Sequence, residues 1–65
     1  MSSREDFLNR VLAMALFNRA TVVKELYDEL RIGDNPRVNL LAEELVDINK
    51  DIAYCEREIK KEQCK

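Results

Sequence analysis

The sequence VNLLAEELVDINKDIAYCEREI, residues 38–59, has apolar residues at alternating steps of three and four. A heptad repeat of this kind places one narrow apolar stripe along a single side of an α-helix. A second helix is needed to bury such a stripe, and residues 3–32 form the other long segment of the chain. The stripe consists of Val38, Leu41, Leu45, Ile48, Ile52, Cys55 and Ile59.

The residues between the two segments have the composition of a tight helix-to-helix turn. Gly33 can adopt the left-handed conformation that ends a helix. Asn35 can cap the next helix, and Pro36 suits its first position, where no N–H is needed. A short connection makes consecutive helices antiparallel neighbours. We therefore expect an all-α fold, an antiparallel two-helix hairpin with helices at residues 3–32 and 36–62 and a turn at 33–35.

One charged residue interrupts the apolar side expected for the first helix. The hairpin brings Leu30 near Val38, and it brings Arg19 beside Ile48 and Asn49. Arg19 either forms a buried polar layer that fixes the register, or lies at the edge with its stem packed and its head in water. The stripe expected on the first helix is Leu12, Leu16, Val23, Leu26 and Leu30.

The first helix carries more apolar surface than one partner helix can cover. Residues 11–17 are apolar without interruption, so the helix is apolar on all sides there. Some of these side chains could simply remain exposed, but we expect a second interface, with another copy of the chain or with a target protein. The hairpin would then dimerise into a four-helix bundle. The residues expected to mediate self-association or partner binding are Phe7, Leu8, Val11, Met14 and Phe17.

An acidic surface is expected on the second helix. Glu43, Asp47 and Asp51 follow one another at steps of four, and Glu44 is adjacent. Such a surface is either a solvated outer face or a docking face for a basic partner. Nothing converges on these carboxylates from elsewhere in the sequence, so no metal site is expected.

Composition argues against several classes of function. The chain has 65 residues and no histidine, and its few hydroxyl groups have no base beside them, so we expect no catalysis and no cofactor. Cys55 and Cys64 would lie roughly 13 Å apart along one helix, too far for a disulfide, although Cys64 could link two chains. The net charge of −2 disfavours nucleic acid, and no apolar stretch is long enough to span a membrane. A cytoplasmic location is expected.

The start of the second helix resembles the small sporulation phospho-aspartyl phosphatases. These helical hairpins carry a proline at the start of their second helix, followed by a Ser-Gln-Glu-Leu-Asp motif. Here Pro36 is followed by Ala42-Glu43-Glu44-Leu45-Val46, in which Glu44 and Leu45 match the motif. The resemblance implies a two-helix fold and, as an alternative function, a degenerate response-regulator phosphatase.

In length and expected architecture the chain is also similar to the plasmid RNA-binding hairpin, Rop, which implies an RNA-binding dimer as a second alternative. The function we expect from the residues themselves is that of a small non-catalytic regulatory or inhibitory protein. It would act by protein–protein binding, both to itself and to another protein.

Overall fold

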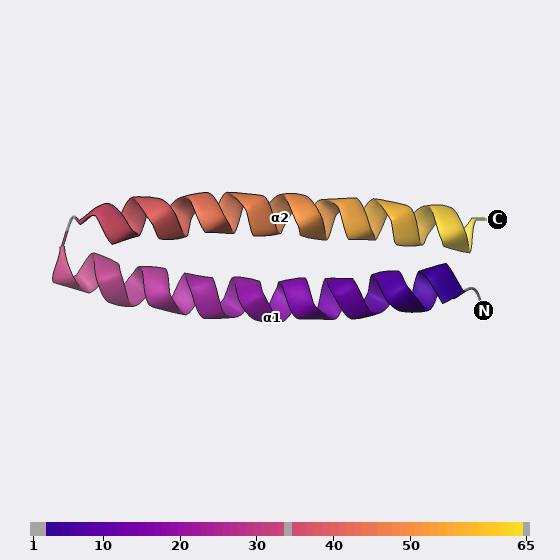
Figure 1. Ribbon diagram of the computed structural model, residues 1–65, viewed down its shortest axis with the longest axis horizontal. Helices are drawn as coiled ribbons and strands as arrows, with labels where there is room; N and C mark the ends of the chain where they lie inside the picture. The colour runs from indigo at the N-terminus through magenta and orange to yellow at the C-terminus, as the bar shows by residue number, and fades with distance from the viewer. Residues whose placement is uncertain (1–2, 34, 65) are drawn as a thin grey trace.

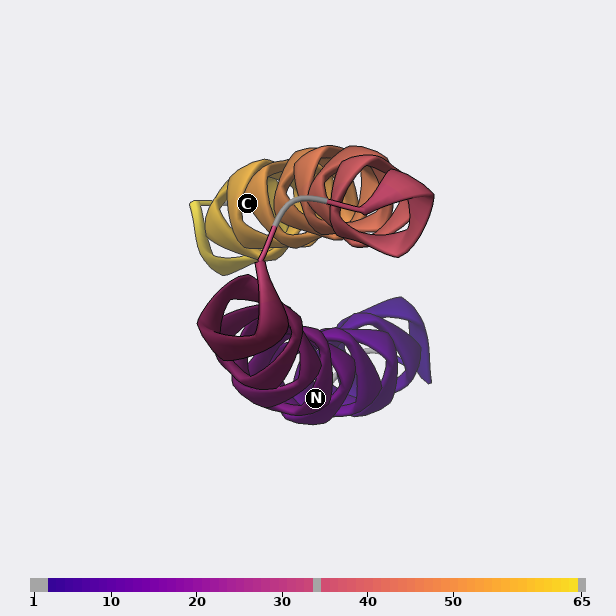
Figure 2. The same ribbon diagram turned by 90° about the vertical axis from the view of Figure 1, so that its left-hand side faces the viewer.

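The computed structural model describes residues 3–33 and 35–64, which form two antiparallel helices (Figure 1). Helix α1 spans Ser3–Ile32 and helix α2 spans Pro36–Gln63. The hairpin measures 49 × 14 × 12 Å, and the start of α1 lies beside the end of α2 at one end of it. The described residues contain no strand, which confirms the prediction of an all-helical chain with two helices. Seen from its closed end, the hairpin is a single layer of two crossing helices (Figure 2).

Asn35 fixes the start of α2 with its side chain. Its backbone is extended, and its Oδ1 atom accepts hydrogen bonds from the N–H groups of Arg37 (2.9 Å) and Val38 (3.2 Å). These bonds satisfy two of the donors that the first turn of a helix leaves unpaired. Its Nδ2 atom donates to Glu29 Oε2 at 3.2 Å, which ties the cap to α1.

Gly33 ends α1 in a conformation that suits glycine. Its φ is +122°, which residues with a Cβ rarely adopt, and its N–H donates to the carbonyl oxygen of Glu29 at 3.2 Å. Position 34 of the predicted turn lies outside the described residues.

The core is a single row of side chains between the two helices. Every residue of the stripe predicted on α2 is buried or half-buried in the structure. The stripe is therefore the side of α2 that faces α1, as the heptad spacing indicated. The buried residues of both helices are Leu8, Ala15, Val22, Leu41, Ile52, Cys55 and Ile59.

The side of α1 that faces α2 differs from the expected one. Leu16 is 40% exposed and Leu30 is 50% exposed, so neither belongs to the core. The expectation was wrong because α1 has apolar residues on a wide sector, and the narrow stripe of α2 covers only part of it. The residues that α1 turns toward α2 are Leu8, Leu12, Ala15, Arg19, Val22 and Leu26, again at steps of four and three.

Arg19 lies at the edge of the core. It is half-buried, and no charged or polar residue is buried among the described residues. Its Nη1 atom donates to Asn49 Oδ1 at 3.4 Å. This contact agrees with the predicted level of Arg19 in the hairpin, and the edge position was one of the two alternatives.

Ion pairs connect the helices at both ends of the hairpin. At the open end, Arg4 Nη2 lies 2.7 Å from Glu58 Oε1, and Arg4 Nε lies 3.1 Å from Glu62 Oε1. At the closed end, Arg37 lies 3.5 Å from a carboxylate oxygen of Glu25 and 3.3 Å from one of Glu29. Because the arginine of each pair is exposed, each pair adds little stability, but together they favour one register of the two helices.

Candidate functional site

An apolar surface that α2 leaves partly uncovered runs along α1, and we name it the α1 stripe. Its side chains follow one another at steps of three and four, so they lie on one side of the helix, next to the core. Leu16 is 40% exposed, Tyr27 is 67% exposed and Leu30 is 50% exposed. The α1 stripe consists of Ala13, Leu16, Ala20, Val23, Tyr27 and Leu30.

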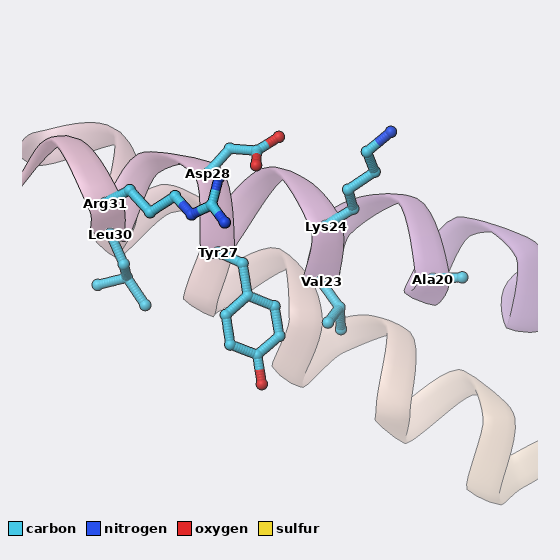
Figure 3. A pocket seen from close by; sticks show the side chains of 7 residues that line it. All are labelled: Ala20, Val23, Lys24, Tyr27, Asp28, Leu30 and Arg31. Carbon is cyan, nitrogen blue, oxygen red and sulfur yellow. The ribbon is translucent and has the colours of Figure 1, made fainter.

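Figure 3 shows the C-terminal half of the α1 stripe. Val23, Tyr27 and Leu30 project to the same side of α1, whereas Lys24 and Asp28 project away from it. These residues, with Ala20 and Arg31, line an open groove of about 610 Å³. The groove has an apolar floor and a charged rim, a common arrangement in protein–protein interfaces.

The α1 stripe continues onto α2 through Leu45. Leu45 lines a second, mainly apolar hollow of about 310 Å³ together with Val23, Leu26, Tyr27 and Leu30. Ala42 precedes Leu45 by almost one turn and Asn49 follows it by about one turn, so small side chains flank Leu45 on this side of α2. Another helix could therefore approach both helices of the hairpin closely here.

The sequence analysis named other residues for self-association or partner binding. Phe7, Met14 and Phe17 are 62%, 66% and 72% exposed, and Val11 is half-buried. Leu8, by contrast, is only 4% exposed and belongs to the core of the hairpin. It is therefore not available to a partner, because α1 packs on α2 as far as its first turns.

The other members of that group are centred on a different side of α1 from the α1 stripe. Phe7, Val11, Met14 and Phe17 follow one another at steps of four and three, so neighbours among them also lie close together on the helix. The sequence analysis missed the α1 stripe as a separate surface. Its own repeat of three and four residues, from Ala13 to Leu30, is the signal that could have revealed it.

The opposite side of the hairpin carries an acidic groove. Three of the four acids proposed for a docking face, Glu44, Asp47 and Asp51, line a hollow of about 430 Å³. Glu25 of α1 lines it too and adds a fourth carboxylate that the sequence analysis did not place there. Glu43 is exposed but does not line this groove. Phe7 and Met14 lie fourteen and seven residues before Thr21, which lines this groove, so this side of the hairpin carries exposed apolar side chains as well as acids.

The acids and cysteines of the described residues lie apart from one another. No three of their cysteine or carboxylate side chains come close enough together to hold a metal ion. Cys55 is buried, and Cys64 is exposed near the end of α2. Neither helix has a stretch that is both long enough and apolar enough to cross a bilayer.

The segment that resembles the phosphatase motif, residues 42–46, lies on the first half of α2. Leu45 is half-buried beside the α1 stripe, and Glu44 is in the acidic groove. These two motif-matching residues thus point to different sides of the hairpin. No family model, curated protein or solved structure matches the chain.

Proposed function

We propose that the chain is a small non-catalytic regulatory or inhibitory protein that self-associates as a four-helix bundle and acts by binding another protein. The observation that carries this proposal is the α1 stripe, which α2 leaves uncovered. Leu16, Tyr27 and Leu30 are 40–67% exposed on one side of a helix, although the hairpin has a partner helix beside them. An apolar surface that follows a heptad repeat fits the side of another helix.

The energetics favour covering this surface. Burying the exposed half of a Leu or Tyr side chain stabilises by roughly 1 kcal/mol, at 25 cal/mol per Å² of apolar area. In a symmetric dimer each such residue is covered in both copies, so the dimer gains this amount twice for each position. In addition, a chain of 65 residues has only a small core of its own, and chains of this size commonly gain stability by association.

The acidic groove gives the bundle a surface for a second protein. It lies on the side away from the α1 stripe, so a dimer formed through the stripe leaves Glu25, Glu44, Asp47 and Asp51 accessible. Glu25 already pairs with Arg37 at 3.5 Å, so Glu44, Asp47 and Asp51 are the carboxylates of this groove that favour a basic partner. We place the protein in the cytoplasm, where Cys55 and Cys64 would remain reduced.

The test is copurification of the immobilised chain from its native host, followed by mass spectrometry. Glu44→Lys reverses a charge inside the acidic groove, and Glu43→Lys makes the same change beside the groove. We expect a protein that binds the wild type and Glu43→Lys but is lost with Glu44→Lys. Recovery of RNA in a salt-sensitive manner, with no protein, would contradict the proposal and favour the Rop-like alternative.

A further inference from the structure

The side chains of the α1 stripe match in size those of a second α1 stripe that runs antiparallel to it. A two-fold axis that crosses α1 between Thr21 and Val22 places each stripe residue opposite another stripe residue of an antiparallel second copy. In each of these layers a smaller side chain meets a larger one, and such layers interdigitate without leaving voids. The facing pairs are Ala13 with Leu30, Leu16 with Tyr27, and Ala20 with Val23.

From this complementarity we infer that the α1 stripe is covered by a second copy of the same chain, in antiparallel register, with Leu16 of each copy packed against Tyr27 of the other. The inference rests on the self-association proposed above and specifies its surface and register. The open groove of about 610 Å³ beside Tyr27 is the space that the second copy fills.

The neighbouring surface of α2 fits the same symmetry. The contact between Arg19 and Asn49 shows which residues of the two helices are level, and by that level Val46 lies beside the two-fold axis. Val46 is 52% exposed, and its neighbours toward Leu45 are the small residues Ala42 and Asn49. In the dimer it lies near the Val46 of the second copy, and small Ala42 allows the two α2 helices to approach.

The residues along the outer edge of the α1 stripe also find partners. The symmetry brings Phe17, which is 72% exposed, near Lys24 of the second copy, whose stem and ammonium can pack on the ring. It also brings Arg10 near Arg31 of the second copy, but this like-charge pair is at the exposed edge, where water and salt screen it.

A charge-complementation experiment tests the register. Leu16→Lys and Tyr27→Glu each place an unpaired charge in two layers of their own homodimer, and we expect about 100-fold weaker association or more for each. When the two variants are mixed, the new ammonium and the new carboxylate face each other in one layer, and the other layer keeps its native Leu and Tyr. We therefore expect a heterodimer within about tenfold of wild-type affinity.

The matched control is a mixture of Leu16→Lys with Leu30→Glu. Leu30 is also in the α1 stripe and half exposed, but in the inferred register it faces Ala13, so no heterodimer should form. Sedimentation equilibrium and native mass spectrometry measure the association, and far-UV circular dichroism checks that each variant remains helical. Lysine and glutamate are good helix formers, and all three sites are at least 40% exposed.

The outcomes separate the inference from the proposed self-association. A heterodimer with Leu30→Glu rather than Tyr27→Glu would overturn the register while leaving the α1 stripe as the dimer surface. Homodimers of Leu16→Lys as tight as the wild type would overturn the surface itself. A helical wild-type monomer at micromolar concentration would overturn the proposed self-association and, with it, the inference.

Discussion

Two adjacent leucines of α2 offer a matched test of the hairpin. Leu41 is 4% exposed and faces α1, whereas Leu40 is 64% exposed, so Leu41→Ala and Leu40→Ala make the same chemical change in two environments. Truncating a buried leucine to alanine costs about 2–5 kcal/mol. The same change on an exposed helix surface costs within about 0.5 kcal/mol, because alanine is at least as good a helix former.

These figures are large relative to the stability of such a chain. At about 0.05–0.15 kcal/mol per residue, 65 residues have a free energy of unfolding of about 3–10 kcal/mol. Leu41→Ala should therefore remove a large part of the stability, and Leu40→Ala should remove little of it.

Urea unfolding followed by far-UV circular dichroism measures the difference. The two variants and the wild type are compared at one protein concentration, because the stability of an associating chain depends on it. Equal midpoints for Leu40→Ala and Leu41→Ala would refute the reasoning, since the side of α2 that faces α1 would then be a different one.

Three further predictions concern single contacts. Arg19→Leu should raise the free energy of unfolding by about 1 kcal/mol, measured by urea titration. Leucine extends the apolar row, and only a 3.4 Å hydrogen bond to Asn49 is lost. A lower free energy of unfolding would show that the fold needs Arg19. Asn35→Ala should lower the thermal midpoint, because about 1 kcal/mol of capping free energy is lost, and Asn35→Ser should have a midpoint close to that of the wild type. A midpoint of Asn35→Ala equal to that of the wild type would contradict the cap. Hydrogen bonds from Lys61 and Arg4 hold the pKa of Glu58 below its ordinary value of 4.5. The ionised Glu58 carboxylate therefore stabilises the fold above pH 4.5, and this contribution is lost as the pH falls through the lowered pKa. Glu58→Gln should therefore lose less stability than the wild type between neutral pH and acid, and an unchanged pH profile would contradict this.

The second helix and the turn could be predicted from sequence because each has one unambiguous signal. The apolar residues of α2 fall in a single narrow stripe, so only one side of the helix can face a partner. Gly33 and Asn35 each supply a conformation or a hydrogen bond that few other residues can supply at that position.

The first helix could not be oriented by the same reasoning. Its apolar residues occupy more than one side, and the sequence analysis chose a core through Leu16 and Leu30, whereas the structure has Ala15 and Val22 in the core. The contacts with α2 make that choice. Leu8 is buried for the same reason, since it precedes Leu12 and Ala15 at steps of four and three and so lies on the side of α1 that faces α2.

The acidic surface was predicted in part. Spacing on α2 alone grouped Glu43 with the acids at steps of four after it, because those residues share one side of that helix. The groove, however, is formed between two helices. Its fourth acid, Glu25, comes from α1 and depends on how the helices face each other, which spacing along one helix does not specify.

The central claim is that α2 leaves the α1 stripe uncovered and that a second copy of the chain covers it. Sedimentation equilibrium of the wild-type chain at micromolar concentration tests this most directly. We predict a particle of twice the 7.6 kDa chain mass, and a shift to the mass of one chain for Leu16→Lys. A helical wild-type particle of 7.6 kDa, with the α1 stripe exposed to water, would contradict the claim.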